Sequence, residues 1–219
     1  MTGLLCGILG LDLSGDPSRI ALGTSGGIEE AAFQGERGRQ LFPCLDSLLA
    51  SAGLSRAELT GIVTGTGPGS YTGLRIACTA ARTLSLALGI PAIGISTFEA
   101  AALAAPEDSQ VHVLLDAHRR EIYHAVYRRG CEDVEVVVAP RVLPRDEGSR
   151  AVPPGSLLIG DPGLCAAEVD VLAARIAPPA LSLLRLAGKR FGSPRDSAWS
   201  ARPAPNPLYL RAAALRRGP

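Results

Sequence analysis

The chain has 219 residues, a formal net charge of +1 and 47% hydrophobic residues. This near-neutral balance argues against a broad electrostatic attraction to nucleic acid, and the apolar content is enough for a sizeable core. The five cysteines are scattered and form no C-x-x-C pair, so neither a disulfide framework nor a structural zinc site is expected. No apolar run approaches the roughly 20 residues of a membrane span, so a cytoplasmic protein without membrane attachment is expected.

The first half of the sequence predicts three strands followed by alternating helices and strands. Tight turns separate the first three strands, which indicates an antiparallel meander. Apolar residues at intervals of three or four then predict a helix, in which Pro43 fits only within the first turn. Serine followed three residues later by glutamate, at Ser55 and at Ser96, predicts two capping boxes. The expected strands are 4–13, 18–23, 27–33, 59–67 and 91–96, and the expected helices are 41–52, 74–88 and 96–105.

The second half repeats this order, with strands first and helices later, which indicates a structural duplication. A turn at 106–109 separates the halves, so two lobes are expected. These are residues 1–105 and a smaller, partly irregular lobe at 106–219 that ends in a proline-rich tail. Within the second lobe we expect strands at 111–117, 121–129, 134–139 and 156–161, an irregular loop at 140–156, helices at 164–177 and 181–192, and a short docked segment at 208–217.

The segment at 65–77, GTGPGSYTGLRIA, connects an expected strand to an expected helix. Backbone N–H groups of such a glycine loop, together with the N-terminus of a helix, can bind a phosphate. However, the loop lacks the lysine of a P-loop, and Ser70 stands where the third glycine of G-x-G-x-x-G should be. A tight turn in which glycines allow close packing is the alternative interpretation, and both remain open.

In each half of the sequence, one aspartate lies at the end of the first expected strand. Carboxylates at such strand ends can hold Mg²⁺ or orient a water beside a phosphate. An Asx turn after the strand is an equally good explanation. Asp12 and Asp116 are therefore candidates for both roles.

A hydrolase site and a metal site are both weakly supported. The nucleophile elbow G-x-S-x-G would need glycines where Pro68 and Thr72 flank Ser70, so capping of the following helix is expected instead. The histidines lack the H-x-x-x-H spacing of a metal pair, and ordinary strand or surface residues are expected. They are His112, His118 and His124.

Four stretches in a fixed order resemble the TsaB family, also called YeaZ. They are GILGLDLSG, GTGPGSYTGLRIACTAARTLSLALGIPAIGISTFEA, LLDAHRREIYHAVY and PLYLR. The resemblance covers most of the chain and is weakest at about 140–200. It implies an α/β protein with the actin-like/Hsp70-like ATPase (ASKHA) fold, in which each of two lobes has a mixed β-sheet flanked by helices.

The resemblance also implies a function. Members take part in threonylcarbamoylation of the adenosine next to the anticodon in tRNA, as a non-catalytic dimerisation partner and platform for the catalytic paralogue TsaD. The ATPase TsaE joins this complex, and tRNA is reached through it. A homodimer and a monomer both remain open for the isolated chain. No cofactor is required by this chain, while ATP or ADP with Mg²⁺ at the complex interface remains open.

Two departures from the family pattern bear on the site. GERGRQLFP lacks the single histidine of many relatives, and LDLSG replaces the more usual IDTS, which removes a hydroxyl next to Asp12. The resemblance makes the glycine loop a vestige of a nucleotide-binding ancestor that is kept mainly for packing. The vestigial site is expected at Asp12, Gly65, Gly67, Gly69, Ser70, Thr72, Gly73 and Asp116.

The partner surface is expected on the helices at 41–52 and 75–86. Its residues are expected to be Leu41, Leu45, Leu48, Arg75, Cys78, Thr79, Arg82 and Leu86. Two alternatives to the platform function are a nucleotide-binding sensor, which would use the two aspartates and the glycine loop, and a peptidase that acts on its paralogue.

Overall fold

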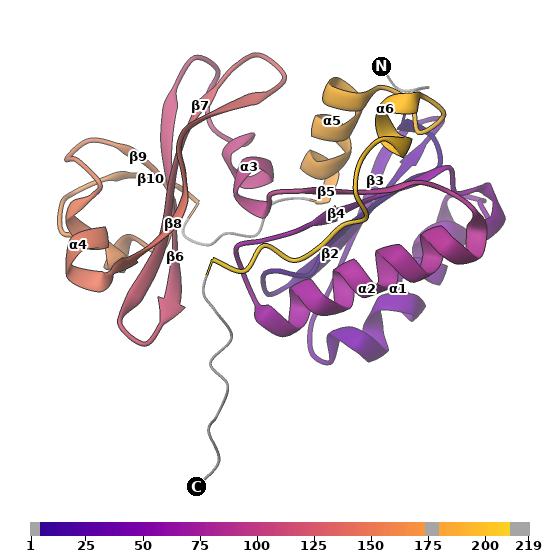
Figure 1. The fold of residues 1–219 in the computed structure, drawn as a ribbon, viewed down its shortest axis with the longest axis horizontal. Coiled ribbons are helices and arrows are strands. Elements are labelled where there is room, and N and C mark those ends of the chain that lie inside the picture. The colour runs from indigo at the N-terminus through magenta and orange to yellow at the C-terminus, as the bar shows by residue number, and fades with distance from the viewer. Residues whose placement is uncertain (1–4, 174–179, 211–219) are drawn as a thin grey trace, which may run out of the picture.

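The first of two five-stranded sheets is built from the N-terminal half of the chain (Figure 1). The computed structural model describes residues 5–173 and 180–210. The strand order is β3-β2-β1-β4-β5, in which β1, β2 and β3 pair antiparallel and β4 and β5 add in parallel. The strands are β1 (Ile8–Asp12), β2 (Ser18–Thr24), β3 (Gly27–Phe33), β4 (Gly61–Gly65) and β5 (Ala92–Ile95).

The second sheet repeats the topology of the first. From one edge to the other its order is β8-β7-β6-β9-β10, with the antiparallel pairs first and the parallel pairs after them. The strands are β6 (Gln110–His118), β7 (Glu121–Arg129), β8 (Val134–Pro144), β9 (Leu157–Gly160) and β10 (Asp170–Ala173). The structural duplication expected from the order of elements is therefore confirmed.

Helices cover both faces of the first sheet (Figure 1). The leucines at 9 and 11 pack with α1 and α2 on one face, whereas Ile8 packs with α5 on the other. This is the two-residue alternation of a strand that is buried on both sides. The helices are α1 (Arg37–Ser51), α2 (Tyr71–Leu88), α3 (Thr97–Ala102), α4 (Arg145–Arg150), α5 (Ala180–Phe191) and α6 (Ser197–Ser200), with 3-10 turns η2 (Arg56–Glu58) and η3 (Pro162–Leu164).

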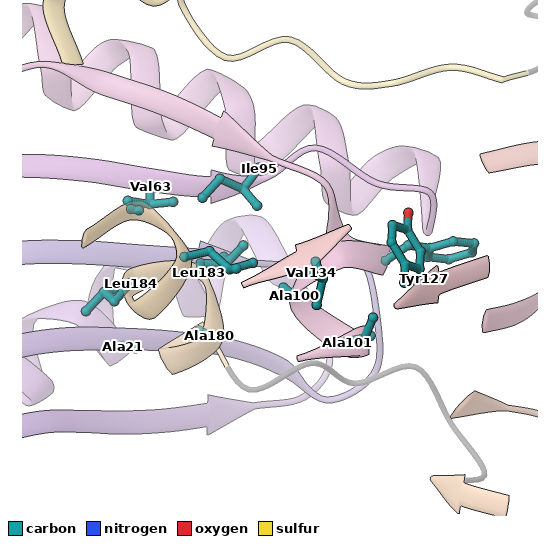
Figure 2. Close-up of a cluster of buried hydrophobic side chains, with 14 of the residues drawn as sticks. Ala21, Val63, Ile95, Ala100, Ala101, Tyr127, Val134, Ala180, Leu183 and Leu184 are labelled. Carbon is teal, nitrogen blue, oxygen red and sulfur yellow. The ribbon is translucent and has the colours of Figure 1, made fainter. Parts of the chain in front are cut away.

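The C-terminal part of the chain returns to the first sheet. Leu183 and Leu184 of α5 are fully buried, and Figure 2 shows them beside Val63 and Ile95 of the first sheet. Gly10 makes this possible, because a Cβ there would lie 2.3 Å from Cδ1 of Leu184. The division at 105/106 therefore does not follow the packing of α5, which the sequence placed in the second lobe.

One apolar cluster continues from the first lobe into the second. Ala100 and Ala101 of α3 lie between α5 and the second sheet, where Tyr127 and Val134 are buried (Figure 2). A polar contact follows the same route, because Arg190 of α5 pairs with Glu99 of α3 and, at 2.6 Å, with Asp133 in the β7–β8 turn. The lobes therefore share a core and a network of ion pairs.

Several local predictions were wrong. Pro43 lies inside α1 beyond its first turn, because α1 begins earlier, at Arg37, whose guanidinium donates to the carbonyl of Gly15. The expected loop at 140–156 contains the end of β8 and all of α4, and the expected helix at 164–177 includes β10. Residues 174–177 lie outside the described residues, as does 211–217 of the expected final segment.

Of the two expected capping boxes, one forms. The backbone N–H of Ser55 donates to Glu58 at 2.8 Å, and the box is complete. Ser96 instead donates its hydroxyl to the carbonyl of Gly67, and Glu99 is held by Arg190. Within the described part of the chain, no helix combines the length and the apolarity needed to cross a membrane.

Replacement of Leu184 by alanine tests the packing of α5. Because this side chain is fully buried over Gly10, we expect the free energy of unfolding to fall by about 2–5 kcal/mol in denaturant titrations. The control is Leu86→Ala, since Leu86 is 88% exposed and its loss should change stability by less than about 0.5 kcal/mol. Equal effects of the two variants would contradict the packing described here.

Candidate functional site

The glycine loop is seated on the segment that follows β1. The backbone N–H of Ser70 donates to the carbonyl of Ser14 at 2.8 Å. A Cβ at Gly73 would lie 1.8 Å from the carbonyl oxygen of Leu13, so no larger residue fits there. Ser70 caps α2 as expected, because its Oγ accepts from the N–H of Gly73 at 3.3 Å. Close packing therefore accounts for glycine at position 73.

Asp12 connects three parts of this region from a buried position. Its Oδ1 accepts from the backbone N–H of Ser14 at 2.9 Å and from the Ser14 hydroxyl at 2.5 Å. Its Oδ2 accepts from the hydroxyl of Thr97 at 3.0 Å, and that hydroxyl in turn accepts from the N–H of Gly67 at 3.1 Å. Burial raises the pKa of Asp12, while the hydrogen bonds from Ser14 and Thr97 act against this shift.

These contacts give Asp12 a structural function. It forms the Asx turn that was one of its two expected roles. Leu13 carries no hydroxyl next to the aspartate, as the departure at LDLSG implies, and the hydroxyl that donates to Asp12 is that of Ser14, two residues after it. Gly65 packs against the same carboxylate, since a Cβ there would lie 2.2 Å from Oδ2. Both carboxylate oxygens are thus engaged with protein groups.

Asp116 lies two residues before the end of β6 on the second lobe and forms a similar turn. Its Oδ1 accepts from the backbone N–H of His118 at 2.8 Å. The next residues form the tip of the β6–β7 hairpin, where His118, Arg119 and Arg120 all have a positive φ of 52–63°. Left-handed conformations are costly for such side chains, and strained backbone of this kind is concentrated at functional sites.

A cleft of about 780 Å³ lies between the lobes. It brings together four of the expected residues, Gly69, Ser70, Thr72 and Asp116, whereas Asp12, Gly65, Gly67 and Gly73 do not line it. Arg37 and Arg119 also line the cleft and are the cations that could face a phosphate, beside the N-terminus of α2. Nucleotide binding here stays a prediction.

A second hollow, of about 500 Å³, runs between α1 and α2 on the outer surface of the first lobe. We call it the helix groove. Its walls are largely apolar, and the aromatic rings of Phe42 and Tyr71 contribute to them. The groove is lined by Gly38, Leu41, Phe42, Tyr71, Thr72, Arg75, Ile76, Thr79, Ala80 and Thr83.

The expected partner residues divide between the core and the surface. The apolar stripes of both helices face the sheet, so Leu41, Leu45, Leu48 and Cys78 are buried, and of these only Leu41 reaches the groove. On the surface, Arg75, Thr79 and Leu86 are exposed, while Arg82 donates to the carbonyl of Pro205 at 2.8 Å. Sequence reasoning missed Phe42, Ile76 and Thr83, which lie beside the predicted stripe rather than on it.

The three histidines do not form a common site. His112 Nδ1 lies 3.1 Å from His124 Nε2, and both rings are buried, whereas His118 is exposed at the hairpin tip. Burial lowers the pKa of His112 and, with the charges of His112 and Arg141, lowers that of His124 to about 4. Among the described residues, no group of three His, Cys, Asp or Glu side chains is placed to hold a metal ion.

Comparison with known proteins identifies the family of the chain. A family model described as TsaD, tRNA N6-adenosine threonylcarbamoyltransferase, matches residues 24–156. An Escherichia coli protein named tRNA threonylcarbamoyladenosine biosynthesis protein TsaB is 30% identical over 62% of this chain and 64% of its own length. The Bacillus subtilis protein of the same name is 38% identical over 39% of this chain and 38% of its own length. The chain belongs to the TsaB (YeaZ) family.

Solved structures share the fold of this chain. YeaZ from Pseudomonas aeruginosa superposes with a TM-score of 0.76 over 93% of this chain and 99% of its own, at 24% identity. A second structure, titled as similar to peptidase YeaZ from the same organism, has a TM-score of 0.77 and 26% identity, with the same coverage. The expected fold, the actin-like ATPase fold of the TsaB family with two mixed sheets flanked by helices, is confirmed.

Thr97→Val tests the function of Asp12 as a connector. The variant keeps the shape of the side chain but leaves Oδ2 of a buried carboxylate without its donor, so we expect a loss of about 1–3 kcal/mol in unfolding free energy. The matched control is Thr79→Val on the exposed face of α2, where little change is expected. If the unfolding free energy of Thr97→Val equals that of the unsubstituted chain, the hydrogen bond between Thr97 and Asp12 does not contribute to stability.

The buried histidine pair predicts a pH dependence of stability. Because the folded pKa of His124 is below its ordinary value of 6.5, the unfolded chain binds more protons between pH 6.5 and about 4. The contribution of the neutral His124 to the unfolding free energy is complete above pH 6.5. It is lost as the pH falls towards 4, which lowers the unfolding free energy by up to about 3 kcal/mol. The pKa of Asp12 is raised in the folded chain, so its protonation increases the unfolding free energy as the pH falls, opposite to the effect of His124.

Denaturant titrations across this pH range provide the measurement. In His124→Gln the fall in unfolding free energy between pH 6.5 and 4 should be smaller than in the unsubstituted chain. His118→Gln, at the exposed tip, is the control. If the fall is the same in His124→Gln and the unsubstituted chain, the buried pair is not its source.

Proposed function

We propose that the chain is a non-catalytic subunit in the biosynthesis of tRNA threonylcarbamoyladenosine, and that it is the dimerisation partner and platform for a TsaD paralogue. The names of the relatives in E. coli and B. subtilis support the pathway. The helix groove between α1 and α2 is the observation that supports the platform function. An exposed hollow with apolar walls is typical of a surface that binds another protein.

The side chains along the groove suit the close approach of a partner helix. Thr79, Ala80 and Thr83 on α2 have small side chains, which allow the backbone of another helix to approach closely. Leu86 continues this row three residues after Thr83 and is 88% exposed. Phe42 adds an aromatic ring at the α1 side. Phe42 is exposed in this chain, and an aromatic side chain that a partner buries usually contributes much of the binding energy.

The same surface would serve the other expected partners. In the isolated chain it would pair with a second copy, and in the complex it would hold TsaD, with the ATPase TsaE joining and tRNA reached through the assembly. We place this complex in the cytoplasm. Asp12 and Ser70 support a non-catalytic subunit, since both are engaged in structural hydrogen bonds. The Oγ of Ser70 accepts from the N–H of Gly73 as a helix cap, which gives this serine a structural role that needs no peptidase activity.

The nucleotide-sensor alternative rests on the cleft between the lobes. Arg37, Arg119 and the N-terminus of α2 could bind the phosphates of ATP or ADP with Mg²⁺. A nucleotide held there would accompany the platform function rather than replace it. Calorimetry with ATP and Mg²⁺, on the isolated chain and on its complex with TsaD, separates a nucleotide in this cleft from one that needs the interface.

A reconstituted reaction tests the proposal. It contains TsaD, TsaE and the threonylcarbamoyl-adenylate synthase of the same organism, with and without this chain, and threonylcarbamoyladenosine in tRNA is measured by mass spectrometry. We expect the modification only when the chain is present. Modification that proceeds equally well without the chain would rule out the platform function.

Leu86→Arg tests the groove within that assay. A buried cation without a partner is costly, so we expect the affinity for TsaD and the yield of modified tRNA to fall about tenfold or more. The matched control is Val136→Arg, an exposed apolar residue on β8 of the other lobe, for which both should stay within about twofold. A Leu86→Arg variant that binds normally would place the interface elsewhere on the chain.

A further inference from the structure

The segment at 203–210, which we call the C-terminal strap, is fixed to the first lobe. Figure 1 shows it in yellow, running from α6 across this lobe towards the space between the two sheets. Pro205 is buried beside Gly94 of the edge strand β5, and its carbonyl accepts from Arg82 of α2. The backbone N–H of Leu208 donates to the carbonyl of Thr66 at 2.7 Å.

The last ring of the strap contacts the first residue of α2. The ring centroids of Tyr209 and Tyr71 are 5.0 Å apart, with an angle of 32° between the planes. On the same helix, the guanidinium of Arg75 lies 5.5 Å from the centroid of the Tyr71 ring. Tyr71 is 49% exposed and Tyr209 is 45% exposed, so they are partly held in place by each other rather than by the core.

Tyr71 separates the two hollows of the molecule. Tyr71 and Thr72 line both the helix groove and the cleft between the lobes. Arg75 lies on the groove side only, and Tyr209 lies on the cleft side only. The ring of Tyr71 is therefore a wall common to both, with one contact on each side.

We propose that Tyr209 is a positioning residue for partner docking, because it holds Tyr71 as the end wall of the helix groove. The C-terminal strap then sets the affinity of the groove for TsaD, although Tyr209 lines the cleft rather than the groove. This inference rests on the proposed function and identifies how the docking site is ordered. A side chain that is already held in its bound orientation loses less conformational entropy on association.

The decisive variant is Tyr209→Ala, compared with Tyr209→Phe and with Leu208→Ala. Alanine removes the ring contact, phenylalanine keeps it, and Leu208→Ala shortens the neighbouring side chain of the strap while the backbone contact with Thr66 remains. Ordering one further side chain on association corresponds to a loss of affinity of about threefold to tenfold. We therefore expect Tyr209→Ala to bind TsaD about threefold to tenfold more weakly, and the two other variants to stay within about twofold.

Hydrogen exchange in the free chain provides a second readout that does not depend on TsaD. Loss of the ring contact should loosen the first turn of α2, so amides near 73–76 are expected to exchange several-fold faster in Tyr209→Ala than in Tyr209→Phe. A general destabilisation would instead raise exchange across the whole helix. The stability of each variant, from denaturant titration, identifies that case.

The outcomes separate the two proposals. Weaker binding with faster exchange confined to the first turn supports the inference. Normal binding of Tyr209→Ala, while Leu86→Arg remains impaired, overturns it and leaves the proposed function intact. Equal loss in Tyr209→Ala and Tyr209→Phe also overturns it, because the ring contact would then not be the cause. Failure of the unsubstituted chain to bind TsaD overturns the proposed function and, with it, the docking effect of Tyr209.

Discussion

The close approach of the glycine loop to residues 13 and 14 is the constraint on which the rest of the first lobe depends. With the carbonyl of Leu13 where a Cβ of Gly73 would be, α2 can begin only against the end of β1. Asp12, Ser14 and Thr97 then bind the loop from the other side through buried hydrogen bonds. The position of α2 follows from this packing, and the helix groove and the cleft are placed on either side of its first turn.

The two sheets share one topology but differ in the helices that cover them. Both sheets have the same order of antiparallel and parallel strands, yet within residues 5–173 and 180–210 two long helices lie together on one outer face of the first sheet alone. The second sheet carries the short helix α4 and loops on one face, and α3, which also contacts α5, on the other (Figure 1). Its face cannot offer a groove between parallel rows of side chains, whereas α1 and α2 do so because their apolar stripes are committed to the sheet and their flanks remain exposed.

The C-terminal region holds the two lobes together through contacts with both of them. α5 comes late in the sequence and packs on the first sheet, and Arg190 at its end binds Glu99 and Asp133. Further along, the strap passes over α2 and brings Tyr209 to Tyr71. The C-terminal region therefore connects the core, the cleft and the groove, although its sequence pattern suggested only a tail of the second lobe.

Local patterns in the sequence were enough to determine most strands, the main helices, the duplication and the family, because alternation, helical spacing and the glycine motif are properties of short segments. They also identified Ser70 as a cap and left the aspartates open between Asx turns and metal chemistry. Long-range packing decided what remained. It directed Leu45, Leu48 and Cys78 to the core rather than to a partner, placed α5 on the first sheet, and set Tyr209 against Tyr71. These contacts join residues that are distant along the chain, so no pattern within a segment could reveal them.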